Sequence, residues 1–361
     1  MPDPALDTLI ARVRAARAAK TALNICGGGT KVFYGEAPHG EPLDVRPLAG
    51  ISSYEPTELV VTARAGTPLA ELEAALAEQG QCLPFEPPRF GPAGTVGGMV
   101  AAGLAGPARA AVGGVRDYVL GATLLNGRAE VLSFGGQVMK NVAGYDVSRL
   151  LAGSMGVLGV ICEVSLKVLP TPVATTTLRF ELDEAAALKQ LNTWGGQPLP
   201  VNASAWWEGT LVLRLSGAAA AVQSAVKKLG GEVVDPVLAA AFWTGLRDHT
   251  DEFFDGATKA VAGGATLWRL SVAQTSPPMG LSGEMMIEWG GAQRWVVTTA
   301  PAATLREAAA RAGGHATAFR GAKAAGAMAP LSAPLARIHS EMKTAFDPDR
   351  IFNPGRLYPG L

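Results

Sequence analysis

The chain has 361 residues with 31 basic and 31 acidic side chains, so its formal net charge is zero. This balance argues against binding to nucleic acid and against attachment to an anionic membrane surface by charge. Hydrophobic residues make up 48% of the sequence and charged residues 17%, which at this length predicts two domains with large buried cores.

The cysteine residues and the N-terminal sequence indicate the cellular compartment of the protein. No Cys-x-x-Cys pair occurs, so neither a disulfide framework nor a cysteine-based metal or iron–sulfur site is expected from Cys26, Cys82 and Cys162. The first residues lead into a charged segment rather than an apolar signal sequence. The Ala/Gly-rich stretch 95–115 is interrupted by Pro107 and Arg109, so no transmembrane segment is expected. We therefore expect a cytoplasmic protein.

The first elements alternate between helix and strand. Residues 5–19 carry apolar side chains at helical spacing and predict an amphipathic helix. A further helix is expected with Thr67 as N-cap, Pro68 in its first turn and Gly80 at its end. Short strands are expected at 23–26, 43–45 and 59–65.

The first strand leads into a glycine loop, made of Gly27, Gly28, Gly29, Thr30 and Lys31. Without Cβ atoms the backbone N–H groups can approach an anion closely, while the last two residues add a hydroxyl and a positive charge. These donors suit the diphosphate of a dinucleotide. A plain glycine-rich turn explains the same residues. The Walker and Rossmann loops are disfavoured, because neither the order Gly-Thr-Lys nor the segment that follows fits them.

A second glycine-rich motif predicts a short helix of small residues over 95–103, with Thr95 as its N-cap. Each glycine in a helix costs about 1 kcal/mol relative to alanine. A flat or charged ligand lying directly on the helix accounts for these glycines, and so does close packing of two backbones. The motif alone leaves both interpretations open.

The next region predicts an antiparallel hairpin and a further strand. Strands at 118–125 and 131–134 are joined by the turn Asn126-Gly127. A polar run at 140–146 and a glycine cluster at 153–159 follow. Residues 160–168 then alternate between apolar and polar side chains, which predicts a strand with one solvent-exposed face.

Pro170-Thr171-Pro172 marks a domain boundary, beyond which strands and helices alternate. Strands are expected at 176–182, 211–215, 266–272, 284–289 and 294–298, and helices at 183–194, 218–229 and 303–311. This pattern predicts an α+β domain whose sheet is covered on one face. After a small-residue linker at 321–329, a last helix places Leu335, Ile338, Met342 and Phe346 on one face and ends at Asp347-Pro348.

Taken in order, the motifs GGGT, TVGG, KNVAGYD…GSMGVLGVICEVSLKVLP and FNPG resemble the FAD-binding domain of the vanillyl-alcohol oxidase/PCMH-type flavoproteins. The resemblance covers roughly residues 20–170 and the tail 347–361. It implies an α+β fold, in which a PCMH-type FAD-binding domain of two α/β subdomains carries a smaller α+β cap. The implied division is 1–170 for the FAD-binding domain, 171–330 for the cap, and 331–361 for a helix and tail returning to the first domain.

The resemblance also assigns the FAD site. It places the diphosphate on the glycine loop, the diphosphate and flavin along the small-residue helix, the adenosine half beside a strand start, and the flavin ring near the tail. The implied residues are Gly27, Gly28, Gly29, Thr30, Lys31, Thr95, Gly97, Gly98, Ala102, Gly159, Val160, Ile161 and Asn353. Some family members attach the flavin covalently through a loop histidine, where this chain has Thr30 and Lys31. We therefore expect dissociable, non-covalent FAD.

The cap segment 288–295 resembles that of FAD-binding subunits from glycolate-oxidising complexes. This implies glycolate, a simple 2-hydroxy acid, as the substrate of the complex, and a catalytic flavin subunit and an iron–sulfur subunit as partners. Any contact with the inner membrane would be made through those partners. Relatives that oxidise D-2-hydroxy acids carry paired cap histidines and a Glu-His-Gly base. Here Glu288 precedes Trp289, and no histidines pair at ligand spacing among His39, His249, His315 and His339.

The expected function is therefore an FAD-binding subunit that supports the catalytic flavin subunit or relays its electrons. Two alternatives stay open from the sequence. One is a self-sufficient FAD-dependent D-2-hydroxy-acid dehydrogenase, and the other is a scaffold subunit without flavin.

Overall fold

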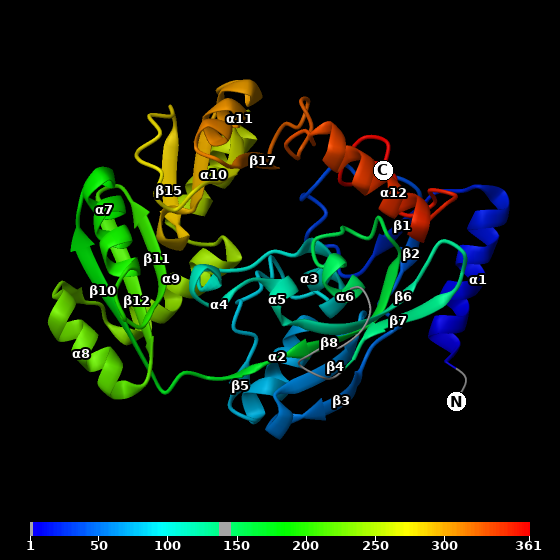
Figure 1. The fold of residues 1–361 in the computed structure, drawn as a ribbon, viewed down its shortest axis with the longest axis horizontal. Coiled ribbons are helices and arrows are strands. Elements are labelled where there is room, and N and C mark those ends of the chain that lie inside the picture. Colours follow the sequence, from blue (N-terminus) through cyan, green and yellow to red (C-terminus); the bar gives the residue numbers. More distant parts are fainter. Residues whose placement is uncertain (1–2, 137–145) are drawn as a thin grey trace.

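The computed structural model describes residues 3–136 and 146–361, so most of the predicted polar run at 140–146 lies outside the described residues. Two parts are visible in Figure 1. We call the sheet and helices formed by residues 174–320 the cap. The base consists of the chain before it together with the C-terminal helix and tail. No described helix is long and apolar enough to cross a membrane.

The base begins with helix α1 (Pro4–Ala19), which the sequence predicted and which Asp3 caps at its N-terminus. Its buried side chains pack on strands β1 (Leu23–Cys26) and β2 (Glu41–Asp44), which form a two-stranded parallel sheet. The glycine loop leaves this sheet at the end of β1.

A five-stranded antiparallel sheet forms the second layer of the base, in the order β3-β4-β8-β6-β7. Its strands are β3 (Ile51–Glu55), β4 (Val60–Arg64), β6 (Val119–Leu125), β7 (Val131–Gly135) and β8 (Val160–Lys167). The prediction of one solvent-exposed face on β8 is wrong in part. Ser165 is buried and shares a hydrogen bond of 2.8 Å with Thr62, because β8 is the central strand of the sheet.

Helices α2 (Leu69–Glu78) and α3 (Val96–Ala102) pack on this sheet. The prediction of Thr67 as N-cap of α2 is wrong. Pro68 occupies that position, and the Thr67 hydroxyl instead exchanges hydrogen bonds with the backbone of Gly50. The remaining short elements of the base are η1 (Pro56–Glu58), β5 (Gln81–Cys82), α4 (Arg109–Val112), α5 (Val115–Tyr118), α6 (Val147–Leu150) and β9 (Leu169–Pro170).

The cap is an eight-stranded antiparallel sheet in the order β13-β10-β12-β11-β15-β16-β14-β17. Its strands are β10 (Ala174–Glu181), β11 (Val201–Trp207), β12 (Thr210–Gly217), β13 (Glu232–Val233), β14 (Thr266–Ser271), β15 (Glu284–Glu288), β16 (Gln293–Thr298) and β17 (His315–Arg320). A short turn of helix, η2 (Trp289–Gly291), joins β15 to β16. The five predicted cap strands are confirmed, whereas β11, β13 and β17 were not foreseen.

Helices cover both faces of the cap sheet, so the prediction of one covered face is wrong. One face packs on the three predicted helices, α7 (Glu184–Gly195), α8 (Ala219–Leu229) and α11 (Ala302–Arg311). The opposite face packs on two unforeseen helices, α9 (Pro236–Asp248) and α10 (Glu252–Ala262). This second face also carries the aromatic cluster through which the cap rests on the base.

The last helix, α12 (Ala333–Phe346), ends where the sequence predicted and returns to the base (Figure 1). Met342 and Phe346 pack against the core of the five-stranded sheet, while Leu335 and Ile338 stay exposed. Only half of the predicted apolar face is therefore buried. The tail beyond α12 then runs back to β1, where Phe352 pairs with Leu23 in a parallel bridge.

Candidate functional site

A cavity of about 130 Å³ lies where the glycine loop, the start of α3 and the C-terminal tail meet. It brings together eight of the residues expected from the sequence, namely Gly27, Gly28, Gly29, Thr30, Lys31, Thr95, Gly98 and Ala102, together with Asn353 from the tail. Further lining residues that the sequence did not single out include Cys26, Met155 and Arg356. Two distant segments and the tail thus converge on one site.

The glycine loop presents free backbone donors at this site. Within the described parts of the chain, none of the backbone N–H groups from Gly27 through Lys31 donates a hydrogen bond. The loop begins where β1 ends, since the Cys26 carbonyl accepts the last ladder bond from Val45. Gly29 has φ +70°, a conformation that suits glycine. Successive unpaired amides of this kind form an anion-binding concavity.

Two of the loop glycines also allow close packing. A Cβ on Gly28 would lie 1.4 Å from the Ala93 carbonyl oxygen, and one on Gly27 would lie 2.5 Å from the Thr95 hydroxyl. Close packing therefore explains why Gly27 and Gly28 have no room for a Cβ, while their backbone amides remain unpaired in the described part of the chain. Both requirements act on the same short loop, because Gly27 and Gly28 pack against the Ala93–Thr95 segment, of which Thr95 also lines the cavity.

Helix α3 adds its N-terminal turn to the cavity. The Thr95 side chain accepts a hydrogen bond of 3.2 Å from the Gly98 amide, so its predicted capping role is confirmed. Gly98 lines the cavity. Gly97 does not, because it lies on the side of the helix that packs on Ala65, where a Cβ would come within 2.6 Å of the alanine Cβ.

The three residues expected beside the adenosine half of FAD, Gly159, Val160 and Ile161, do not line the cavity. Val160 and Ile161 are buried in the central strand β8, where they pack in the base cores. Gly159 has φ +152°, and a Cβ there would lie 2.7 Å from the Leu125 carbonyl oxygen. In this structure the three residues form the beginning of strand β8 and the position just before it.

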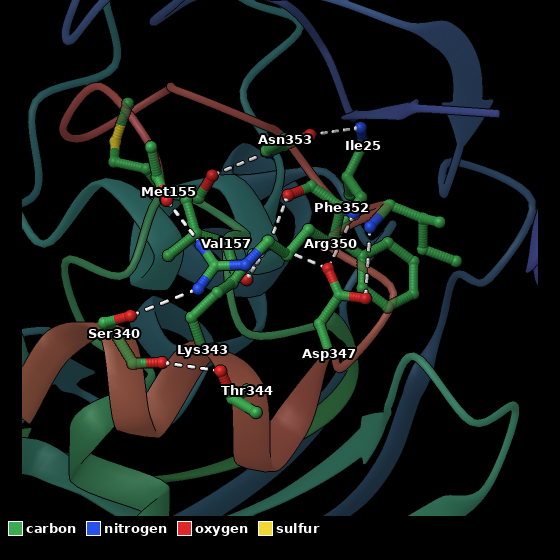
Figure 2. A network of polar contacts seen from close by, with 12 residues as sticks. Ile25, Met155, Val157, Ser340, Lys343, Thr344, Asp347, Arg350, Phe352 and Asn353 are labelled. Atoms are coloured by element: carbon green, nitrogen blue, oxygen red, sulfur yellow. Dashed lines mark hydrogen bonds and ion pairs between the residues drawn. The ribbon is translucent and has the colours of Figure 1, made fainter. Parts of the chain in front are cut away.

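Asn353 joins the tail to the glycine-loop strand. Its Oδ1 accepts a hydrogen bond of 2.7 Å from the Ile25 amide, and its Nδ2 donates one of 2.6 Å to the Met155 carbonyl (Figure 2). Its backbone lies in the left-handed region, with φ +40°, which asparagine tolerates better than most residues. The amide side chain therefore fixes the tail beside the cavity.

A buried ion pair supports the same tail from below (Figure 2). Lys343 Nζ lies 2.7 Å from Asp347 Oδ2 and also donates to the carbonyls of Val157 and Phe352, at 2.8 and 2.7 Å. Asp347 in turn accepts hydrogen bonds from the amides of Ile351 and Phe352. The contacts with Ile351 and Phe352 hold the tail next to Asn353, while the contact with Val157 joins α12 to the base.

The cavity is electropositive. Burial lowers the pKa of Lys31 to about 8, although the more distant carboxylates of Asp248 and Glu73 act in the opposite direction. The only hydrogen bond of the Lys31 ammonium group within the described residues is a 3.5 Å contact with the Thr30 hydroxyl. No carboxylate lines the cavity. A bound anion would therefore supply the missing counter-charge, and the residues present fit a diphosphate.

The sequence reasoning missed Arg356, a second cation at the cavity. The signal was available, because the arginine directly follows the F-N-P-G motif at 352–355. It also missed Cys26, whose thiol pKa is raised mainly by burial. A raised pKa leaves less thiolate and so lowers the nucleophilicity of this cysteine toward a bound group.

The candidate bases lie elsewhere in the structure. None of the four histidines lines the cavity, and His249 is stacked on Phe254 with ring centroids 3.6 Å apart. Burial lowers the pKa of His249 well below its ordinary value. Glu288 is buried in the cap, where burial raises its pKa to about 7 although Trp295 and Gln293 both donate hydrogen bonds to it. Among the described residues, no cluster of three metal-ligating side chains occurs.

Comparisons with known structures agree with the fold. The chain superimposes on alkyldihydroxyacetonephosphate synthase with a TM-score of 0.67 at 14% sequence identity, covering 96% of this chain and 74% of that one. At this identity the likeness concerns the fold alone. The expected α+β architecture, a PCMH-type domain with a smaller cap, is confirmed.

Sequence comparisons identify the family. A family model described as "FAD binding domain" matches residues 5–135. Glycolate oxidase subunit GlcD of Bacillus subtilis (strain 168) is 30% identical over 165 residues, which is 45% of this chain and 35% of that protein. D-lactate dehydrogenase of Archaeoglobus fulgidus is 35% identical over 153 residues, 40% of this chain and 32% of that protein. Both of these matches cover less than half of either protein.

One similarity spans the whole chain. Glycolate oxidase subunit GlcE of Escherichia coli (strain K12) is 48% identical over 353 residues, which is 98% of this chain and 97% of that protein. Identity of this extent includes the base, the cap and the tail alike. The chain therefore belongs to the family of glycolate oxidase subunit GlcE, with an FAD-binding domain in its N-terminal part.

Proposed function

We propose that this chain is the FAD-binding subunit of a glycolate-oxidising complex, in which it supports a catalytic flavin subunit or relays its electrons. The observation that carries the proposal is the 48% identity to glycolate oxidase subunit GlcE along essentially the full length. The partial match to subunit GlcD supports a related flavin subunit as the partner. An iron–sulfur subunit is proposed as the acceptor of the electrons.

We propose that the glycine loop binds the FAD diphosphate, and that Thr95, Gly98 and Ala102 of the α3 segment lie along the bound FAD in the same cavity. The unpaired amides from Gly27 through Lys31 and the ammonium group of Lys31 support this assignment. Asn353 would position the tail beside the flavin half. A role for Gly159, Val160 and Ile161 would be limited to their backbone, and Gly97 is left out. The bound flavin would supply electron-carrier chemistry, and the protein sets its position and surroundings.

The lining of the cavity supports an auxiliary rather than a self-sufficient role. Abstraction of a proton from a 2-hydroxy acid needs a base held near the reacting carbon. The cavity is lined by neither histidine nor carboxylate, and the pKa of His249 is lowered by burial among aromatic rings. We propose that the base belongs to the catalytic flavin subunit.

We also propose the division into residues 1–170, 171–330 and 331–361 as FAD-binding domain, cap, and returning helix with tail. Two hydrophobic clusters that belong to the base alone and two that belong to the cap alone support it, beside the aromatic cluster that the two parts share. A cytoplasmic location, with membrane contact only through partner subunits, completes the proposal.

The test is to purify the chain alone and together with the proposed catalytic flavin subunit and iron–sulfur subunit. A flavin count per complex that falls by one when this chain is omitted supports the proposal. Acid precipitation should release this flavin into the supernatant, because no histidine lines the cavity and the Cys26 thiol has a raised pKa. Rapid bleaching of the isolated flavoprotein by glycolate would instead indicate a self-sufficient dehydrogenase. A chain that stays colourless with FAD would indicate a scaffold.

A further inference from the structure

Arg356 belongs to the C-terminal tail, and its side chain reaches the end of the glycine loop. Its side chain is almost fully buried, at 6% exposure. Its Nη2 donates hydrogen bonds to the carbonyls of Val32, at 2.9 Å, and Lys31, at 3.4 Å. Its backbone carbonyl accepts a hydrogen bond from the Glu36 amide at 3.0 Å. The guanidinium is therefore fixed against the last residue of the glycine loop and the residue that follows it.

One nitrogen of the Arg356 guanidinium group has no hydrogen-bond acceptor within residues 3–136 and 146–361. Arg356 Nη1 is buried and has no hydrogen-bond partner among the described residues. No carboxylate forms an ion pair with Arg356 in that part of the chain, and Glu36 acts on it only from a distance. A buried donor on a charged group is costly to leave unpaired, and Arg356 is one of the residues that line the cavity.

The surroundings identify the chemistry of that ligand. Arg356 lines the same cavity as Lys31 and the free amides of the glycine loop. Both cations lack a counter-ion there, and the cavity has no acidic lining. Guanidinium groups bind phosphate oxygens through short charge-assisted hydrogen bonds.

We propose that Arg356 is a direct ligand of the FAD diphosphate, with Nη1 donating to a phosphate oxygen while Nη2 remains on the loop carbonyls. This inference rests on the proposed FAD site. It implies that the binding site is completed by the C-terminal tail, more than 320 residues away from the glycine loop in sequence. Arg356 and Lys31 together would balance the two negative charges of the diphosphate.

The experiment compares Arg356→Gln and Arg356→Lys with the wild-type chain, each freed of flavin. The matched control is Arg337→Gln, an arginine on α12 whose side chain is 81% exposed. Titrations with FAD and ADP, followed by flavin fluorescence and calorimetry, give the dissociation constants. Arg356→Gln should weaken both ligands by roughly 10- to 100-fold, because a hydrogen bond to a charged group is lost. Arg356→Lys should retain part of the affinity, and Arg337→Gln all of it.

Thermal unfolding separates ligand binding from a purely structural role. The proposal expects the FAD-induced rise in melting temperature to shrink in Arg356→Gln. Wild-type affinity in Arg356→Gln, or a loss for FAD without any loss for ADP, would overturn the inference while leaving the proposed function standing. If Arg356→Gln does not fold, an unchanged ADP affinity in Arg356→Lys overturns it equally. A wild-type chain that binds no FAD would overturn the proposed function itself.

Discussion

Lys31 is the residue at which burial and charge act most clearly against each other. The ammonium group is half-buried, its pKa is lowered to about 8 by that burial, and no carboxylate lines the cavity it faces. Such a group stays protonated at neutral pH but with little margin. A bound diphosphate would stabilise the charged form and raise this pKa.

The affinity for FAD should therefore depend on pH through Lys31. In the flavin-free chain Lys31 loses its proton near pH 8, whereas in the complex the phosphate holds the proton to higher pH. Binding is thus strongest below pH 8 and should weaken by up to about tenfold per pH unit above it. Fluorescence titrations from pH 6.5 to 9.5 measure this slope. Lys31→Gln should bind more weakly at neutral pH and show a flatter profile, and an unchanged slope in this variant would assign the dependence to another group.

The packing of the glycine loop gives a second prediction at the residue scale. Gly28→Ala would place a Cβ 1.4 Å from the Ala93 carbonyl oxygen, so the loop must separate from the segment that precedes α3. We expect a loss of about 1–3 kcal/mol in the free energy of unfolding and a loss of FAD binding. Gly196→Ala is the control, because its nearest neighbour would lie at an ordinary 3.8 Å. Urea unfolding and flavin content after purification test both effects, and normal flavin content in Gly28→Ala would contradict the geometry.

At the scale of elements, the C-terminal segment illustrates how a helix and a tail can be joined. Helix α12 buries little of its own apolar face, and its most deeply buried side chain is that of Lys343. Burial lowers the pKa of Lys343 and Asp347 opposes that shift. The ion pair and the backbone hydrogen bonds around it therefore replace hydrophobic packing as the link between α12 and the tail.

Removing one member of the Lys343–Asp347 ion pair should lower the free energy of unfolding. Asp347→Ala leaves the Lys343 charge buried and frees the amides of Ile351 and Phe352. We expect a loss of about 3–5 kcal/mol in the free energy of unfolding, measured by urea denaturation of the flavin-free chain. Glu341→Ala breaks an exposed pair on the same helix, with Arg337, and should change stability by about 0.5 kcal/mol or less. Equal effects of the two variants would mean that the buried pair does not fasten the tail.

The whole molecule depends on contacts between the cap and the base. Glu86 joins the two, since its Oε2 accepts a hydrogen bond of 2.8 Å from the Ala108 amide in the base and its Oε1 lies 2.7 Å from Arg214 Nη2 in the cap. Arg214 is nearly buried and also stacks on Trp243. The carboxylate therefore bridges the two parts at the position where their chains connect.

Glu86→Ala should loosen the cap. Arg214 would lose its only ion-pair partner among the described residues, which should cost about 1–3 kcal/mol. Hydrogen exchange should then increase in β11 and β12 and across the linker before β10, more than in the five-stranded sheet. Glu181→Ala, which removes an exposed carboxylate from the same cap sheet, is the control. Uniform exchange rates in Glu86→Ala would show that the other contacts between cap and base hold the cap without Glu86.

The sequence by itself determined the features that depend on neighbouring residues. The Thr95 cap of α3 and the glycine loop after β1 follow from local hydrogen bonding and backbone freedom. Motif order was enough to identify the flavoprotein fold. Local patterns were insufficient where tertiary neighbours decide, as at Thr67, which bonds to Gly50 instead of capping α2.

Only the tertiary structure decided which residues meet at the cavity. Gly97 packs on Ala65, whereas Gly98 lines the cavity. Periodicity cannot distinguish the two glycines, because it does not determine which face of the helix is turned toward the cavity. It cannot reveal that α9 and α10 cover the second face of the cap sheet. Nor can it bring Arg356 to the glycine loop, since that contact results from the packing of α12 and the tail against β1. Local energies set the conformation of each segment, but long-range burial sets which segments are adjacent.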